Sequence, residues 1–143
     1  MLGVFEARGH GHFANLSSVA GLYPVPLRSG YSASKMALKG FFESMRAENR
    51  NDRIYITMLY PAFINTEISK HALTGDGSDT GVMDDAQAKA MSTQKAVNLM
   101  LSAISDKRPW YSLGGFRETK MAPLLHKMFP SLFMRLLKRA KVT

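Results

Sequence analysis

Short apolar runs alternate with a long stretch of helical periodicity. A mostly apolar run over residues 12–16 ends at Ser17-Ser18, and it predicts a short buried strand. Residues 54–60 are β-branched and aromatic, too short for a typical helix, and followed by Pro61. This second run also predicts a buried strand.

The stretch between these two runs has helical spacing. Residues 30–50 place apolar or small side chains three and four positions apart, and Ser29 is the predicted N-cap. Strand, helix and strand in succession predict a parallel α/β unit. Ligands of such units bind at the carboxyl ends of the strands, which puts Ser17-Ser18 and residues 61–66 on one functional edge.

Weaker signals follow in the second half of the chain. Thr93 is predicted to cap a helix over residues 94–105, and residues 110–113 predict a third short strand. Residues 74–85 contain three glycines and four aspartates, which is typical of a loop. The length of 143 residues suits one domain.

The net charge of +8 is concentrated at the C-terminus. Residues 1–116 carry 12 Lys and Arg against 10 Asp and Glu, whereas residues 117–143 carry 7 against 1. From residue 120 onward, apolar side chains recur at spacings of three and four, which predicts a basic amphipathic helical segment. Pro130 should divide it into helices over 120–129 and 131–140. We therefore distinguish a body, residues 1–116, from a C-terminal segment, residues 117–143.

Three interpretations of residues 117–143 stay open. The helices can pack over a substrate cleft or a dimer seam, with their cations simply solvated. They can also rest on an anionic membrane surface, with Phe129, Leu132, Phe133 and Met134 inserted and the cations facing phosphates. Nucleic acid is the least favoured partner, because no recognition motif accompanies the charge, and we predict no nucleic-acid binding.

Composition excludes several classes of protein. Without cysteine, the chain can form no disulfide, no thiolate zinc site and no cysteine nucleophile. The four histidines lack ligand spacing, so we predict no metal site. No apolar run reaches the roughly 18 residues of a spanning helix, and no secretory signal follows Met1. We expect a cytoplasmic protein, with peripheral membrane association through residues 117–143 as an addition.

Three residues form a candidate catalytic constellation. Tyr31 and Lys35 lie four residues apart on the predicted helix, so both project from one face, and Ser18 follows the preceding strand. An ammonium one helical turn away stabilises a tyrosine phenolate by Coulomb attraction, which suits proton transfer. A serine hydroxyl opposite can hold a substrate oxygen. The Tyr-x-x-x-Lys pair alone is a weak signal, because exposed helical pairs of this kind are common.

Three segments in register resemble the short-chain dehydrogenase/reductase family. Gly-His-Phe-Ala-Asn-Leu-Ser-Ser-Val-Ala-Gly, over residues 11–21, is similar to the family's fifth strand and serine loop. Tyr-Ser-Ala-Ser-Lys, over residues 31–35, is similar to its Tyr-x-x-x-Lys motif, thirteen residues after Ser18. Pro-Ala-Phe-Ile-Asn-Thr, over residues 61–66, is similar to its Pro-Gly-x-Ile/Val-x-Thr segment. The resemblance implies an α/β fold, with this chain as the C-terminal portion of a doubly wound, Rossmann-like parallel sheet.

The resemblance also implies catalytic roles. Tyr31 is the expected general acid or base, which exchanges a proton with the substrate hydroxyl or carbonyl. Lys35 is expected to stabilise the phenolate of Tyr31 and to bind the nicotinamide ribose. Ser18 is expected to orient and polarise the substrate oxygen.

The same resemblance implies a nicotinamide cofactor, NAD or NADP, which carries the hydride. Tyr31 and Lys35 are expected to contact it, together with Pro61, Ala62, Ile64 and Thr66, whose segment closes over the nicotinamide. In that segment the backbone of Ile64 and the hydroxyl of Thr66 would hold the carboxamide. Ala62 stands where the family usually has glycine, which narrows the approach to the cofactor without excluding it.

The implied function is an NAD(P)-dependent oxidoreductase that interconverts an alcohol and a ketone. The implied partner is a small-molecule alcohol or ketone, and an apolar substrate is one of the options. A homo-oligomer is implied by resemblance alone. The family's dinucleotide fingerprint and catalytic asparagine precede its serine loop, and these 143 residues contain neither. We therefore expect this chain to be the catalytic half of a longer enzyme. The alternative is a catalytically silent remnant that acts as an interaction or membrane-surface module.

Overall fold

Three parallel strands form the main sheet. The computed structural model describes residues 2–66, 68, 77–78, 81 and 89–139 of the chain. The strand order is β1 (Gly11–Leu16), β2 (Ile54–Pro61) and β5 (Trp110–Leu113), so β2 lies in the middle. Gly11 is in register with Ile54, and Met58 with Trp110. The predicted α/β class with a parallel sheet is confirmed, and so are its three strands.

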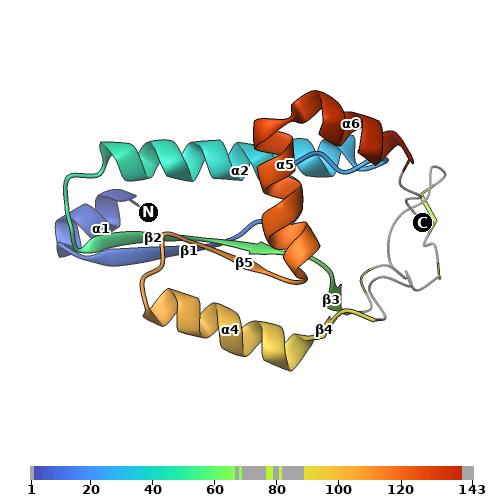
Figure 1. Cartoon of the computed structure of the whole chain (residues 1–143). Helices are drawn as coiled ribbons and strands as arrows, with labels where there is room; N and C mark the ends of the chain where they lie inside the picture. Colours follow the sequence, from blue (N-terminus) through green and yellow to red (C-terminus); the bar gives the residue numbers. More distant parts are fainter. Residues whose placement is uncertain (1, 67, 69–76, 79–80, 82–88, 140–143) are drawn as a thin grey trace.

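Helices cover both faces of this sheet (Figure 1). α2 (Ser29–Glu48) lies on one face and α4 (Thr93–Ser105) on the other. α1 (Leu2–Arg8) packs beside β1, where the Phe5 and Phe13 rings are 4.7 Å apart between centroids. This double coverage explains the near-continuous apolar sequence of β2, whose Met58 has no exposed surface.

Arg46 fixes α2 to the sheet. Its guanidinium donates hydrogen bonds to the carbonyls of Ile56 in β2 and Pro109 before β5, at 2.9 and 2.8 Å. One side chain of the helix thereby joins two neighbouring strands. These two bonds help to set the position of α2 over the sheet.

Both predicted helix caps are wrong by one residue. α2 begins at Ser29 itself, and Arg28 takes the N-cap position without a side-chain hydrogen bond. α4 likewise begins at Thr93, with Ser92 at the N-cap. The Thr93 hydroxyl does not cap the helix, because it donates to the carbonyl of Asn65 at 2.8 Å.

That bond belongs to a second, very short sheet that the sequence pattern does not predict. β3 (Ile64–Asn65) and β4 (Met91–Ser92) pair in parallel, with Ile64 opposite Met91. The pairing holds the end of the segment after β2 against the start of α4. Of the predicted loop over residues 74–85, only residues 77–78 and 81 lie within the described residues.

The C-terminal segment is helical, as predicted. A π-helical turn, η3 (Arg117–Met121), leads into α5 (Ala122–Met128), and α6 (Pro130–Arg139) follows. The predicted division at Pro130 is confirmed, with the proline as the first residue of α6, where its missing N–H breaks no helical hydrogen bond. None of the described helices has the length and apolar content needed to cross a bilayer.

α5 and α6 pack against the loop that follows β1. Phe133 of α6 is 5% exposed, and its ring centroid lies 5.7 Å from that of Tyr23. Val19 completes this buried cluster, and Leu125 and Leu137 pack against it. The predicted insertion of Phe133 into lipid is therefore wrong, because this side chain belongs to the protein core.

Candidate active site

The loop after β1 holds Ser18 at the carboxyl end of the sheet. Ser18 is buried and has an extended backbone, and its Oγ accepts a hydrogen bond from the Ala20 amide at 3.2 Å, which caps the 3-10 turn η1 (Val19–Gly21). The same hydroxyl donates to the carbonyl of Pro61 at 3.4 Å. Ser18 therefore connects the ends of β1 and β2, which is the common edge predicted from the sequence.

Tyr31 and Lys35 lie on one face of α2, close to its N-terminal end. The Lys35 ammonium is 5.6 Å from the centre of the Tyr31 ring and donates to the carbonyl of Leu16 at 3.2 Å. Leu16 is the last residue of β1, two positions before Ser18. The structure thus brings Tyr31 and Lys35 to the strand end from which Ser18 follows, and 44% of Tyr31 is exposed.

The segment over residues 61–66 runs on from β2 at the same edge. Pro61 is buried and its carbonyl accepts the Ser18 bond, while the Ala62 amide donates to the carbonyl of Leu113 at 2.7 Å. Ile64 and Thr66 are half-buried. Four of the residues predicted to contact a cofactor therefore form one continuous stretch that begins in contact with the serine loop.

Ala62 is accommodated by Gly114, in the loop after β5. A Cβ at position 114 would lie 2.5 Å from the Ala62 Cβ, and the Gly114 backbone has a φ of 137°. Only glycine adopts this positive φ without strain and also leaves room for the Ala62 methyl group. The Ala62 methyl group packs against Gly114, beside the apolar cluster around Val19.

Ser17, which the sequence places on the same functional edge as Ser18, and Gly21, which has no predicted role, join the serine loop to α2. The Ser17 hydroxyl donates to the carbonyl of Lys35 at 3.2 Å. A Cβ at Gly21 would lie 2.8 Å from the same carbonyl oxygen, so a glycine lets the loop pass directly against the helix. Small residues at both positions were visible in the sequence, but their contact with Lys35 depends on how the helix packs on the loop.

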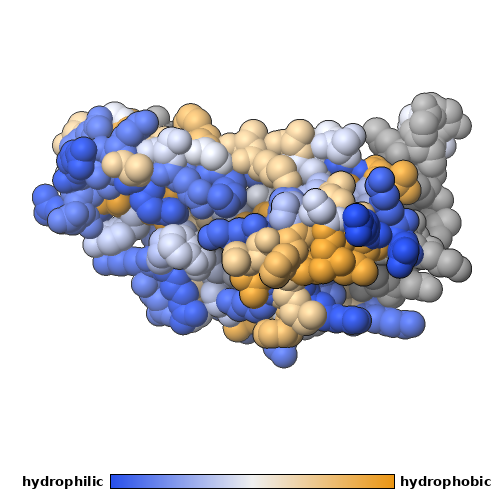
Figure 2. All heavy atoms as spheres, turned by 45° about the horizontal axis from the view of Figure 1, so that its top comes forward, coloured by the Kyte–Doolittle hydropathy of each residue, from blue (hydrophilic) through white to orange (hydrophobic). Residues whose placement is uncertain are grey.

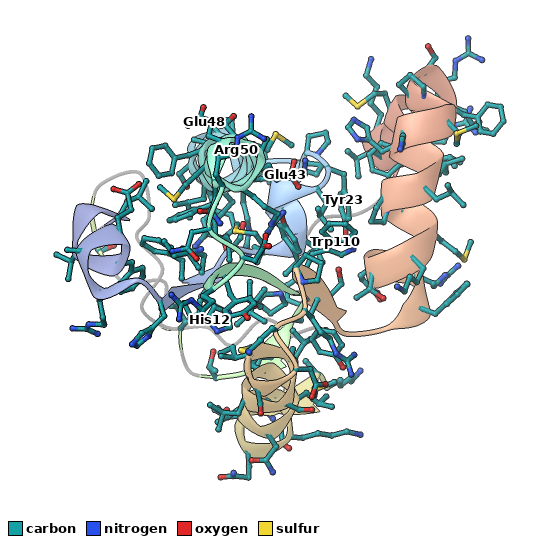
Figure 3. All side chains as sticks on the ribbon, turned by 90° about the vertical axis from the view of Figure 1, so that its left-hand side faces the viewer. His12, Tyr23, Glu43, Glu48, Arg50 and Trp110 are labelled. Atoms are coloured by element: carbon teal, nitrogen blue, oxygen red, sulfur yellow. The ribbon has the colours of Figure 1, made fainter. Side chains whose placement is uncertain are left out.

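The connection between this loop and α2 is held by Ser32, which bonds it to α2, and by Tyr23, which packs against Phe133 of α6. Ser32 is buried, and its Oγ accepts a hydrogen bond from the Val25 amide at 3.3 Å. Tyr23 lies on the side of the body that faces α5 and α6 (Figure 3). Burial, and secondarily the charge of Glu118, raises the pKa of Tyr23 to about 12. Tyr23 therefore stays protonated at neutral pH and serves packing.

Known relatives of this chain carry dehydrogenase/reductase names. "Dehydrogenase/reductase SDR family protein 7-like" of Drosophila melanogaster is 38% identical over 135 residues, which cover 94% of this chain and 41% of that protein. "Dehydrogenase/reductase SDR family member 7B" of Xenopus tropicalis is 37% identical over 123 residues, which cover 86% and 40%. The chain thus spans about two fifths of the length of the curated relatives it matches.

Solved structures share the fold. A short-chain dehydrogenase from Burkholderia cenocepacia in complex with NADP matches with a TM-score of 0.70 at 23% identity, over 95% of this chain and 51% of that one. A short-chain dehydrogenase/reductase from Burkholderia phymatum in complex with NAD matches with a TM-score of 0.63 at 20% identity, over 99% and 55%. The family model described as "short chain dehydrogenase" matches residues 1–77, more than half of the sequence. On this match, and with the sheet and helices arranged as described, the chain belongs to the short-chain dehydrogenase family.

Proposed function

We propose that this chain is the catalytic part of an NAD(P)-dependent oxidoreductase that interconverts an alcohol and a ketone. The observation that carries the proposal is the contact network at the end of β1, where Lys35 bonds the Leu16 carbonyl beside the Tyr31 ring. The names of the relatives, and the NADP and NAD in the Burkholderia structures, support this reaction class. Because those relatives are more than twice as long, the proposal concerns the complete protein.

Tyr31 is the proton-exchanging group of this mechanism. Its partial exposure allows a substrate oxygen to reach its hydroxyl. The Lys35 ammonium, 5.6 Å from the centre of the ring, is the positive charge beside the phenolate that forms when Tyr31 donates its proton to a ketone oxygen. In the opposite direction, the phenolate accepts the proton of an alcohol.

Ser18 orients the substrate oxygen. Its bond to the Pro61 carbonyl is long, at 3.4 Å, and is readily exchanged for a bond to a substrate. The bond that Ser18 accepts from the Ala20 amide keeps the side chain in place during that exchange. Ser18 is therefore a donor whose orientation is already set before substrate binds.

The described residues fit the nicotinamide end of the cofactor. The Lys35 ammonium has three N–H donors, and within the described part of the chain only the Leu16 carbonyl accepts one, so donors are left for ribose hydroxyls. Residues 61–66 follow β2 at the carboxyl edge, where parallel α/β sheets bind their ligands. The bound cofactor supplies or accepts the hydride, while residues of this chain orient the substrate and move its proton.

An apolar cavity beside the start of α2 favours an apolar substrate. It has a volume of about 430 Å³ and is lined by residues 24–27 on one side and by Met134, Leu137 and Lys138 of α6 on the other. Leu27, which is 90% exposed, lies four residues before Tyr31. We assign the apolar part of the substrate to this cavity.

Substitution of Tyr31 in the complete gene product tests the proposal. Tyr31→Phe removes only the hydroxyl, so kcat should fall by about 10²- to 10⁴-fold while the unfolding midpoint stays unchanged. The matched control is Tyr111→Phe, because Tyr111 also lies beside a cation, with Arg108 5.2 Å from its ring centre. The control should keep wild-type turnover.

Two results contradict the proposed mechanism. Near-normal turnover of Tyr31→Phe, or an equal loss in both variants, removes Tyr31 from the proton-transfer role. A complete protein that shows no nicotinamide-dependent turnover with any alcohol or ketone supports the silent-remnant interpretation instead.

A further inference from the structure

The two C-terminal helices carry more apolar surface than their packing uses. The inward stripe of the pair consists of buried Phe133 and half-buried Leu125 and Leu137, which pack on the loop after β1. A second stripe faces outward, with exposed fractions between 48% and 62%. Its members are Met121, Leu124, Met128, Phe129, Leu132 and Leu136.

This outward stripe repeats one spacing in its two halves. Met121, at the end of η3, is followed at steps of three and four residues by Leu124 and Met128 of α5. Phe129, between the helices, is followed at the same two steps by Leu132 and Leu136 of α6. Figure 2 shows hydrophobic side chains gathered on this face of the molecule, next to strongly hydrophilic ones. Exposed apolar side chains that gather on one face, with polar side chains around them, mark a contact surface.

A cation accompanies each exposed leucine of the stripe. Lys127, Arg135 and Arg139 each stand three residues after a leucine, at positions 124, 132 and 136, and so share its side of the helix. All three cations are exposed, and none forms a salt bridge with another described residue. The surface therefore combines apolar side chains with flanking positive charges that lack acidic partners in the described part of the chain.

We propose that α5 and α6 lie flat on an anionic lipid surface. In this geometry the leucines at 124, 132 and 136 enter the boundary between headgroups and acyl chains, and Lys127, Arg135 and Arg139 contact lipid phosphates. A second copy of this chain fits the surface less well, because a self-complementary contact brings these cations against one another. Nucleic acid leaves the leucines without an apolar partner.

The apolar arm of the test uses vesicle co-sedimentation of the complete gene product without added cofactor or substrate. This readout does not require turnover, so it is independent of the proposed enzymatic function. The chain should bind vesicles of phosphatidylcholine with phosphatidylserine and bind pure phosphatidylcholine at least tenfold more weakly. The triple variant Leu124→Ser, Leu132→Ser, Leu136→Ser should lose this binding. The control is Phe41→Ser, Val97→Ser, Leu101→Ser, equally exposed residues on α2 and α4, and it should bind like the wild type.

The charge arm uses the same vesicles. The triple variant Lys127→Gln, Arg135→Gln, Arg139→Gln should bind these vesicles at least tenfold more weakly. Each cation near an anionic surface contributes separately to the binding free energy. The control removes three exposed cations elsewhere, in Arg50→Gln, Lys89→Gln, Lys95→Gln, and should change binding less than twofold. Equal losses in control and test variants would overturn the proposal, because binding would then follow net charge alone.

Other occupants of the surface are measured in parallel. Sedimentation velocity reports self-association, and a duplex DNA fragment reports nucleic-acid binding. The lipid assignment is wrong if wild-type protein does not bind anionic vesicles. In that case, loss of self-association in the leucine variant would assign the surface to a second copy of the chain, and loss of DNA binding in the cation variant would assign it to nucleic acid.

Discussion

Tyr60 is a buried residue whose hydroxyl has no hydrogen-bond partner among the residues that the structure describes. A buried hydroxyl without a partner destabilises the folded state, because it has given up its bonds to water. Tyr60→Phe should therefore leave the free energy of unfolding at neutral pH unchanged or raise it by up to about 1 kcal/mol. Urea unfolding of both proteins measures this difference.

The same residue predicts a pH dependence. Burial, with a smaller contribution from Glu43, raises the pKa of Tyr60 to about 12, against 10.0 in the unfolded chain. Between these two values the unfolded chain releases the proton while the folded protein keeps it, so stability is fully present below pH 10 and falls as the pH rises toward 12. The loss should reach about 2 to 3 kcal/mol. Tyr60→Phe should lack this part of the alkaline decline, and identical pH profiles for the two proteins would contradict it.

At the scale of elements, the packing of the serine loop on α2 depends on Gly21. A side chain there would meet the backbone carbonyl of Lys35, and backbone cannot move aside as a flexible side chain can. Gly21→Ala should lower the free energy of unfolding by about 1 to 3 kcal/mol and displace Lys35 from the end of β1.

Gly40→Ala is the matched control for that variant. Gly40 lies inside α2 with open space around its Cα, so alanine there should raise the free energy of unfolding by about 0.5 to 1 kcal/mol through better helix propensity. Denaturant unfolding compares the two substitutions. A neutral Gly21→Ala would mean that the loop does not press on the helix as described.

The elements that follow from one local pattern could be predicted. The runs at 12–16, 54–60 and 110–113 became strands because each is apolar and ends at a turn or proline, and α2 follows from its periodicity. β3 and β4 could not be predicted, since each has two residues and exists only through pairing with a distant segment. The predicted Thr93 cap was wrong for a similar reason, because the Thr93 hydroxyl bonds a residue 28 positions away.

Part of the candidate site could likewise be predicted from local spacing, and part depends on how distant segments pack. The side of α2 shared by Tyr31 and Lys35, and the position of Ser18 after a strand, follow from spacing and are found in the structure. The contact of Ser17 with the Lys35 carbonyl arises only when the loop and helix pack together. The roles of Ser18, Tyr31 and Lys35 stay predictions, because they concern chemistry with a bound substrate.

At the scale of the whole molecule, the C-terminal helices and the serine loop share one cluster. Periodicity marks the apolar side of α6 but does not tell which part of it the protein covers. Phe133 fills the covered part, against Tyr23 and beside His126, whose ring centroid is 5.1 Å away, while Leu136 stays 48% exposed. The two side chains lie three residues apart on one helix, so they allow a matched comparison of buried and exposed surface.

Phe133→Ala should lower the free energy of unfolding by about 3 to 5 kcal/mol, because it opens a cavity where α6 meets the loop. Leu136→Ala should change it by less than about 0.5 kcal/mol in solution. In Phe133→Ala, amide hydrogen exchange should quicken in α6 and at Tyr23 before it changes in β2. The Tyr23 amide reports on the serine loop because it donates to the Val19 carbonyl at 3.2 Å. Faster exchange confined to α6 would mean that the helices only cover the serine loop. Faster exchange at both places means that the C-terminal segment helps to hold the serine loop in place.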